Sequence, residues 1–131
     1  MEEAIVQRDM DYVRALLLDI EGKERPGLKD LLPVDAGNAE YAKLAGHLRM
    51  LIDEAGFVSG IPAHINAGKN WLDLRLTWQG HDFLDSVRDP ETWSKTKKGA
   101  AAAGGFTVDL LKDLAMGLIK KQIEEYTGVK L

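Results

Sequence analysis

The 131-residue sequence predicts an α+β fold in which helices accompany a single β-hairpin. Two segments, residues 9–21 and 39–55, repeat apolar residues at steps of three and four, as amphipathic helices do. A third segment, residues 71–76, instead alternates apolar and polar residues after a turn-rich loop, as a half-buried strand does. There is no cysteine, so packing rather than disulfides must stabilise this fold.

The first predicted helix starts after Asp9, a good N-cap, and runs to Glu21 before the breaker Gly22. Its apolar face comprises Met10, Val13, Leu16, Leu17 and Ile20. Proline and glycine then interrupt residues 26–38, where Leu28, Leu31 and Leu32 pack either as a short strand or as a turn.

The second predicted helix is capped by Asn38 and stopped by Gly56. The apolar side of this helix consists of Tyr41, Leu44, Leu48, Leu51, Ile52 and Ala55. The opposite, outward side consists of Lys43, Gly46, Arg49, Met50, Asp53 and Glu54.

Residues 57–61 and 71–76 are expected to form the hairpin, with a loop containing Asn66, Gly68 and Asn70 between them. Strict alternation in the second strand places its leucines inside, and places Trp71, Asp73 and Arg75 outside. The inward residues are Leu72, Leu74 and Leu76.

Three further helices are predicted after the hairpin. Thr77 caps the first of them, and its Gly80 is expected to allow close packing against the hairpin. Asp89 and Pro90 start the next, and Thr107 caps the last, which ends at Gly128. The last helix carries an apolar stripe of Leu111, Leu114, Ala115, Leu118 and Ile119.

The order helix, capped helix, hairpin and short helix is typical of a winged helix-turn-helix-like core. In that fold class the hairpin is the wing. The usual separate second helix is either merged into the start of residues 39–55 or replaced by residues 28–32. We therefore predict a winged-helix-like core over residues 1–88 and a C-terminal helical extension over residues 89–131, within one domain overall.

Several short runs also resemble a known group. They are Arg8-Asp9-Met10-Asp11, His47-Leu48 with Leu51-Ile52, Ala55-Gly56-Phe57, the run from Leu76 to Leu84, and Trp93 with Lys95. In these runs the chain resembles the uncharacterised phage and prophage proteins grouped as domain of unknown function 2513, related to the YjcQ-type proteins. The resemblance implies a winged-helix-like fold and a phage or prophage setting, and no activity. The long connection over residues 26–38 departs from the group's pattern.

Composition and motifs exclude several classes of function. The three histidines lie in different elements without cysteine partners, so we expect no metal site and no cofactor. No serine or threonine sits in a recognisable nucleophile motif, and the glycine-alanine run over residues 99–105 lacks the ending that grips phosphate, so we expect no enzyme. No apolar stretch is long enough for a membrane span, and the acidic N-terminus does not resemble a secretory signal, so a cytoplasmic protein is expected.

DNA binding is the leading functional hypothesis from the sequence. The candidate contacts are Lys43 and Arg49 on the second helix, Lys69 and Arg75 on the wing, and Lys97 and Lys98 on the extension. Asp53 and Glu54 share the helix face with Lys43 and Arg49 and would repel phosphates. Residues 1–90 also hold 10 Lys/Arg against 16 Asp/Glu, which is an acidic balance.

Protein binding is the alternative hypothesis. Met50 is an apolar residue on an otherwise polar helix face, and Trp71 is expected on the outer side of its strand. Leu111, Leu114 and Leu118 could pair two copies of the last helix into a homodimer, although packing within one chain also explains them.

Overall fold

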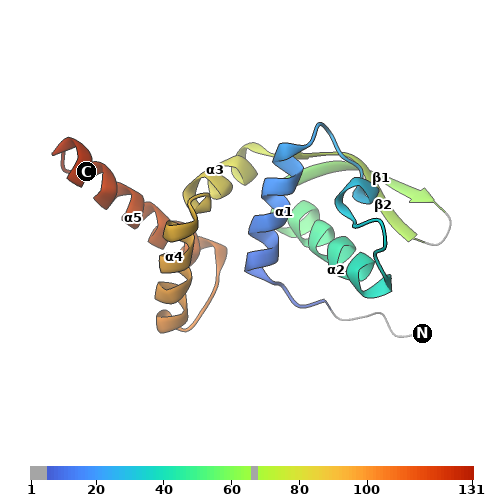
Figure 1. Ribbon diagram of the computed structural model, residues 1–131, viewed down its shortest axis with the longest axis horizontal. Coiled ribbons are helices and arrows are strands. Elements are labelled where there is room, and N and C mark those ends of the chain that lie inside the picture. The colour runs from blue at the N-terminus through green and yellow to red at the C-terminus, as the bar shows by residue number, and fades with distance from the viewer. Residues whose placement is uncertain (1–5, 66–67) are drawn as a thin grey trace. The chain divides into compact units, whose positions relative to one another are not determined.

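The computed structural model describes residues 6–65 and 68–131 (Figure 1). In this part of the chain the α-helices are α1 (Met10–Gly22), α2 (Asn38–Arg49), α3 (Trp78–Val87), α4 (Pro90–Ala103) and α5 (Val108–Thr127). The strands β1 (Val58–Ile65) and β2 (Gly68–Leu76) form a two-stranded antiparallel sheet. The α+β class predicted from the sequence is therefore confirmed.

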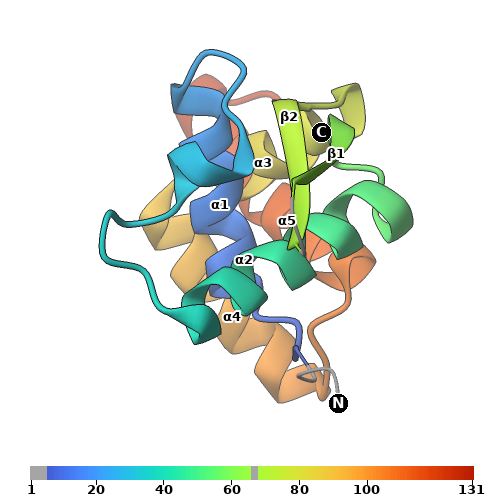
Figure 2. The ribbon, with the colours of Figure 1, turned by 90° about the vertical axis from the view of Figure 1, so that its right-hand side faces the viewer.

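The chain forms two compact units, Met1–His81 and Asp82–Leu131, so the boundary between them falls within α3. Helices α1 and α2 and the hairpin belong to the first unit, where α1 and α2 lie against each other (Figures 1 and 2). Helices α4 and α5 belong to the second unit. The division after residue 88 stays a prediction.

Helix α1 matches its predicted pattern closely. The Asp9 side chain accepts a hydrogen bond from the backbone N–H of Tyr12, which confirms the N-cap. The buried residues of α1 are Met10, Val13, Leu16, Leu17 and Ile20, the five that share the 3.6-residue periodicity. Local periodicity alone therefore identifies the face that this helix buries.

The connection after α1 forms a short 3₁₀ helix, η1 (Leu28–Leu31), so the choice between strand and turn resolves as a helical turn. Asp30 accepts a hydrogen bond from the Gly27 N–H, which closes this turn. The Pro26 carbonyl accepts one from the Leu74 N–H at 2.8 Å. Backbone hydrogen bonding therefore ties the start of this connection to β2.

Helix α2 begins one residue earlier than predicted. Gly37 is its N-cap and Asn38 its first residue, so the expectation that Asn38 caps the helix is wrong. The helix continues into a π-helical turn, η2 (Met50–Glu54), in which the Ala55 N–H bonds to the Met50 carbonyl. Gly56 follows at φ +69°, a left-handed conformation that glycine adopts without strain, and it ends the element as predicted.

The hairpin contains a β-bulge that the sequence pattern conceals. Ser59 pairs with Arg75 and Ile61 with Leu72, so two residues of β2 lie opposite Gly60 alone. One of those two, Asp73, takes φ +57°. A side chain on Gly60 would collide with Leu74, because a Cβ there would lie 2.6 Å from the Leu74 Cδ2.

The bulge reverses the faces of the residues that precede it, because one extra residue shifts a period-two pattern to the other side. Leu74 and Leu76 are buried, as predicted. Trp71 is buried at 7% exposure and Leu72 is exposed at 46%, so the predicted outward position of Trp71 and inward position of Leu72 are both wrong.

Helix α3 starts against the residue that precedes β1. The Thr77 hydroxyl accepts a hydrogen bond from the Gly80 N–H and donates one to the Gly56 carbonyl. A Cβ on Gly80 would lie 2.0 Å from the Phe57 carbonyl oxygen, so only glycine permits this approach. The predicted cap and the predicted reason for the glycine are both confirmed.

In the second unit α4 and α5 pack together. Asp89 and Thr107 cap these helices as predicted, and Gly128 ends α5 at φ +76°. Leu111 and Ala115 are fully buried, whereas Leu118 and Ile119 are half-buried. Leu114 approaches Gly99 of α4, so part of the predicted stripe packs within the chain.

Candidate functional site

The outward face of α2 is partly covered by Val6, which precedes α1. Val6 lies directly on Gly46, since a Cβ on that glycine would come within 2.8 Å of the Val6 side chain. Gly46 was expected on the surface available to a ligand. A partner that used the centre of this helix face would have to displace the segment around Val6.

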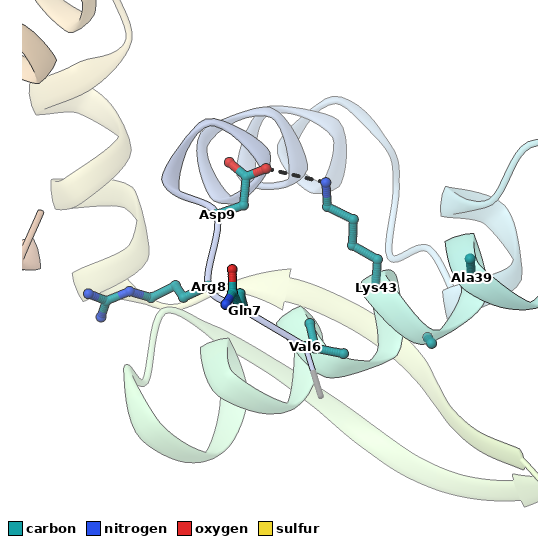
Figure 3. Close-up of a pocket in the computed structure, with 7 residues that line it drawn as sticks. Val6, Gln7, Arg8, Asp9, Ala39 and Lys43 are labelled. Carbon is teal, nitrogen blue, oxygen red and sulfur yellow. Dashed lines mark hydrogen bonds and ion pairs between the residues drawn. The ribbon is translucent and has the colours of Figure 1, made fainter. Parts of the chain in front are cut away.

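Lys43 is held in the same region by two partners (Figure 3). Its Nζ lies 3.3 Å from the Asp9 carboxylate and 4.6 Å from the centre of the Tyr12 ring. The backbone N–H of Tyr12, followed by the Lys43 side chain, lowers the pKa of the Asp9 carboxyl. Burial, followed by the charges of Glu40 and Asp19, raises the pKa of the Tyr12 hydroxyl.

His47 locks the start of α1 onto α2. It is fully buried, and its Nε2 accepts a hydrogen bond from the Asp9 N–H at 3.0 Å. The other ring nitrogen, Nδ1, lies 2.8 Å from the Lys43 carbonyl and therefore carries the proton of the neutral ring. Its ring also packs against Tyr12, with centroids 4.6 Å apart. This histidine has a structural role at the junction of two helices.

A cavity of about 450 Å³ opens beside this junction (Figure 3). In the view shown, the Lys43 side chain reaches toward Asp9 while Arg8 points away from it. Across residues 6–65 and 68–131 no cluster of three or more His, Asp or Glu side chains could hold a metal ion. The lining residues are Val6, Gln7, Arg8, Asp9, Ala39, Ala42 and Lys43.

The other predicted DNA contacts belong to three different elements, α2, β2 and α4. Arg49 lies 3.8 Å from Glu54 in an ion pair, and the Arg75 Nε donates to the Ser59 hydroxyl. Lys97 and Lys98 belong to the second unit, where the Lys97 Nζ lies 5.6 Å from the centre of the Trp93 ring and Lys98 is exposed. The backbone of Lys69 pairs with His64 in the hairpin, and its side chain lies outside the described part of the molecule.

The two residues predicted for protein contact also differ in outcome. Met50 is half-buried at the first position of the π-helical turn. Trp71 is in the core, so it does not lie on the surface as the predicted protein contact requires. The role predicted for Met50 stays a prediction.

The hairpin exposes an apolar pair that strict alternation along the strand does not predict. Ile61 and Leu72 are register partners on the same face of the sheet, 57% and 46% exposed respectively. Gly60, a glycine inside a strand pattern, is a recognised signal for a bulge and could have revealed the reversal. We call this pair, Ile61 and Leu72, the hairpin face.

A second cavity, of about 440 Å³, adjoins Leu72 where the connection after α1 meets β2. Two non-glycine residues at its rim take left-handed conformations, Arg25 at φ +47° and Asp73 at φ +57°. Their side chains form an ion pair at 3.6 Å. The cavity is lined by Arg25, Gly27, Lys29, Asp30, Asn70, Leu72 and Asp73.

Comparison with known proteins identifies the family. The model of the family described as "Hypothetical protein (DUF2513)" matches residues 7–106, which is most of the chain. The chain belongs to this family. An uncharacterised protein of Haemophilus influenzae (strain ATCC 51907 / DSM 11121 / KW20 / Rd) is 24% identical over 119 residues, covering 90% of this chain and 99% of that protein.

The family match covers every residue that lines the two cavities except Val6, and it extends through α4. No solved structure matches the chain. Within the described residues no helix is both long enough and apolar enough to cross a bilayer.

Proposed function

We propose that the first unit is a degenerate winged helix. Its element order, α1, η1, α2, β1 and β2, follows the order of that fold, with η1 in the place of the second helix. In a winged helix a short strand between the first two helices pairs with the wing, and here the backbone hydrogen bond from Leu74 to Pro26 takes the place of that pairing. On this proposal α2 is the counterpart of the recognition helix and the hairpin is the wing.

We propose further that this member of the DUF2513 family is a non-enzymatic protein-interaction module that binds through the hairpin face. The observation that carries this proposal is the exposed cross-strand pair Ile61 and Leu72. An exposed apolar pair beside charged side chains is typical of the boundary between the apolar centre and the polar rim of a protein-protein contact. The phage or prophage setting implied by the resemblance fits a small cytoplasmic protein that acts on a host protein.

Charge indicates the kind of partner. Residues 1–81 contain 9 Lys/Arg and 13 Asp/Glu, a formal balance of −4, whereas residues 82–131 contain 8 of each. A surface with an apolar centre on an acidic unit is complementary to a partner surface that is apolar at its centre and basic at its rim. We therefore propose a basic protein surface as the partner.

DNA binding through α2 is the second candidate, and the winged-helix element order favours it. Three features of the first unit oppose it: Val6 covers Gly46, Lys43 and Arg49 are both in ion pairs, and the unit is acidic. Exposed ion pairs are worth only about 0–1 kcal/mol, so DNA phosphates could compete for these two cations. The covered face of α2 and the net negative charge of the first unit are the larger obstacles to DNA binding.

The two candidates are separated by paired measurements on purified protein. A partner is first identified by cross-linking in the host cell, and its Kd is then measured for the wild type and for the double variant Ile61→Thr with Leu72→Ser. Loss of a central apolar pair is expected to weaken partner binding by at least about tenfold. The matched control is Val129→Thr, because Val129 is 57% exposed, as Ile61 is, but lies after α5.

The DNA candidate is tested with duplex DNA at two salt concentrations and the double variant Lys43→Ala with Arg49→Ala. The proposal expects weak binding whose loss at higher salt is the same for the wild type and this variant. Tight DNA binding that depends on Lys43 and Arg49, together with partner binding that survives the hairpin substitutions, would replace the first candidate with the second.

A further inference from the structure

Asn70 is one of the residues that line the cavity beside Leu72, and its side chain carries a buried acceptor that lacks a donor. Asn70 is 9% exposed, and its Oδ1 has no hydrogen-bond partner among the described residues. Asn70 and Leu72 are two positions apart and precede the bulge, so they share the outward side of β2. A buried carbonyl oxygen without a donor is unfavourable, so this cavity is suited to a group that brings an N–H.

The charges of the residues that line the cavity sum to zero only because of Arg25, and Arg25 is loosely held. Arg25 lies 3.6 Å from the Asp73 carboxylate, longer than a hydrogen bond, and 65% of its side chain is exposed. Without Arg25 the lining charges are Lys29, Asp30 and Asp73, a formal sum of −1. The cavity is therefore suited to one cation in the place of Arg25.

We propose that this cavity is an exchange site for an arginine side chain of the protein partner. The incoming guanidinium replaces Arg25 beside Asp73 and, once the Asn70 side chain turns toward the cavity, also donates to the Oδ1 of Asn70. It thereby makes one hydrogen bond that Arg25 does not make. The inference rests on the proposed function, because Leu72 belongs both to this cavity and to the hairpin face.

A guanidinium suits the site better than an ammonium or a neutral amide. Its planar fork offers five N–H donors in fixed directions, so one group can serve Asn70 and Asp73 together. It is also more weakly hydrated than an ammonium, which lowers the cost of entering a partly buried cavity. A neutral amide would satisfy Asn70 but would leave the charge of Asp73 without a replacement for Arg25.

The probe for this site is N-acetyl-arginine methylamide, with the citrulline analogue as its uncharged isostere. Binding to the full-length chain is followed by NMR through the backbone amides of Gly27 and Leu72. The arginine probe is expected to give saturable shifts at these amides, and the citrulline probe is expected to bind at least about tenfold more weakly.

Three variants sharpen the test. Asn70→Leu and Asp73→Asn are each expected to weaken binding of the arginine probe by about tenfold, and Asp73→Asn decides the point if Asn70→Leu does not fold. Arg25→Gly removes the competing guanidinium and is expected to strengthen binding severalfold. The control Arg88→Ala removes an exposed arginine of another ion pair, with Asp85, and is expected to change nothing.

Equal binding of the two probes, no binding of the arginine probe, or shifts that persist in Asp73→Asn would overturn the exchange site. None of these results would affect the hairpin face, because Ile61 does not line this cavity and the single variant Ile61→Thr tests the hairpin face separately. Loss of partner binding in the hairpin variant, with no response to the arginine probe, would leave the proposed function standing without this site.

Discussion

Gly80 offers a test of how closely α3 packs on the chain before β1. In the variant Gly80→Ala, the new methyl group would lie 2.0 Å from the Phe57 carbonyl oxygen and 2.9 Å from its carbon. The obstacle is backbone, which cannot rotate aside as a side chain can. The same carbonyl accepts a hydrogen bond from the Thr77 N–H, so its displacement also disturbs the start of α3.

The expected effect has two parts of opposite sign. Alanine favours a helix interior over glycine by about 1 kcal/mol, whereas forced overpacking costs about 1–3 kcal/mol and more when backbone must shift. We expect Gly80→Ala to lower the free energy of unfolding by about 2 kcal/mol net. For a unit of this size that corresponds to a fall of about 10 °C in Tm.

The assay is thermal denaturation followed by the backbone amide signals of α1, which report on the first unit. The matched control is Gly117→Ala in α5, where a Cβ would meet nothing within 4 Å. Because Gly117 belongs to the second unit, the amide signals of α5 report on that variant, which is expected to gain up to about 1 kcal/mol from helix propensity alone. A Gly80→Ala protein as stable as the wild type would refute the close approach of α3 to Phe57.

Three more substitutions test the bulge, the backbone of Asp73 and the cap of α1. Trp71→Ala should lower the free energy of unfolding by about 3–5 kcal/mol because Trp71 is buried, whereas Trp78→Ala should change it by less than about 0.5 kcal/mol because Trp78 is 83% exposed. Chemical denaturation measures both variants, and equal effects would contradict the bulge. Asp73→Val should lower the free energy of unfolding by at least about 1 kcal/mol more than Asp73→Asn, since a β-branched residue tolerates φ +57° poorly. Equal stabilities of the two variants in urea would contradict that backbone conformation. Folding lowers the pKa of Asp9, so the charged carboxylate stabilises the fold above the unfolded pKa, and this stabilisation is lost as pH falls through the folded pKa. The stability advantage of the wild type over Asp9→Asn should therefore shrink below about pH 4. A stability advantage that grows with acidity would contradict the lowered pKa.

The features that could be predicted from the sequence are those set by neighbouring residues. The buried face of α1 follows from local periodicity, and the caps Asp9, Asp89 and Thr107 act on N–H groups three residues later. Gly80 could also be interpreted, because a glycine inside a helical pattern usually marks a place where another segment packs closely. Such features need no knowledge of distant parts of the chain.

The features that could not be predicted depend either on contacts between residues distant in sequence or on the extra residue of a β-bulge. The bulge at Asp73 inverts Trp71 and Leu72, and strict alternation cannot show where a strand gains a residue. The cover that Val6 provides over Gly46 joins segments forty residues apart in sequence. The sequence pattern therefore places Trp71 and Leu72 on the wrong faces of the hairpin, and it does not reveal that Val6 covers Gly46 on the outward face of α2.

The hairpin face, rather than the outward face of α2, is proposed to contact the partner, and cross-linking can distinguish the two surfaces. The experiment is photo-cross-linking in the host cell with a photoreactive phenylalanine placed either at position 72 or at position 43. We expect a discrete protein adduct from position 72 that disappears with Ile61→Thr, and no comparable adduct from position 43. A DNA adduct from position 43, with none from position 72, would show that the outward face of α2 is the binding surface instead.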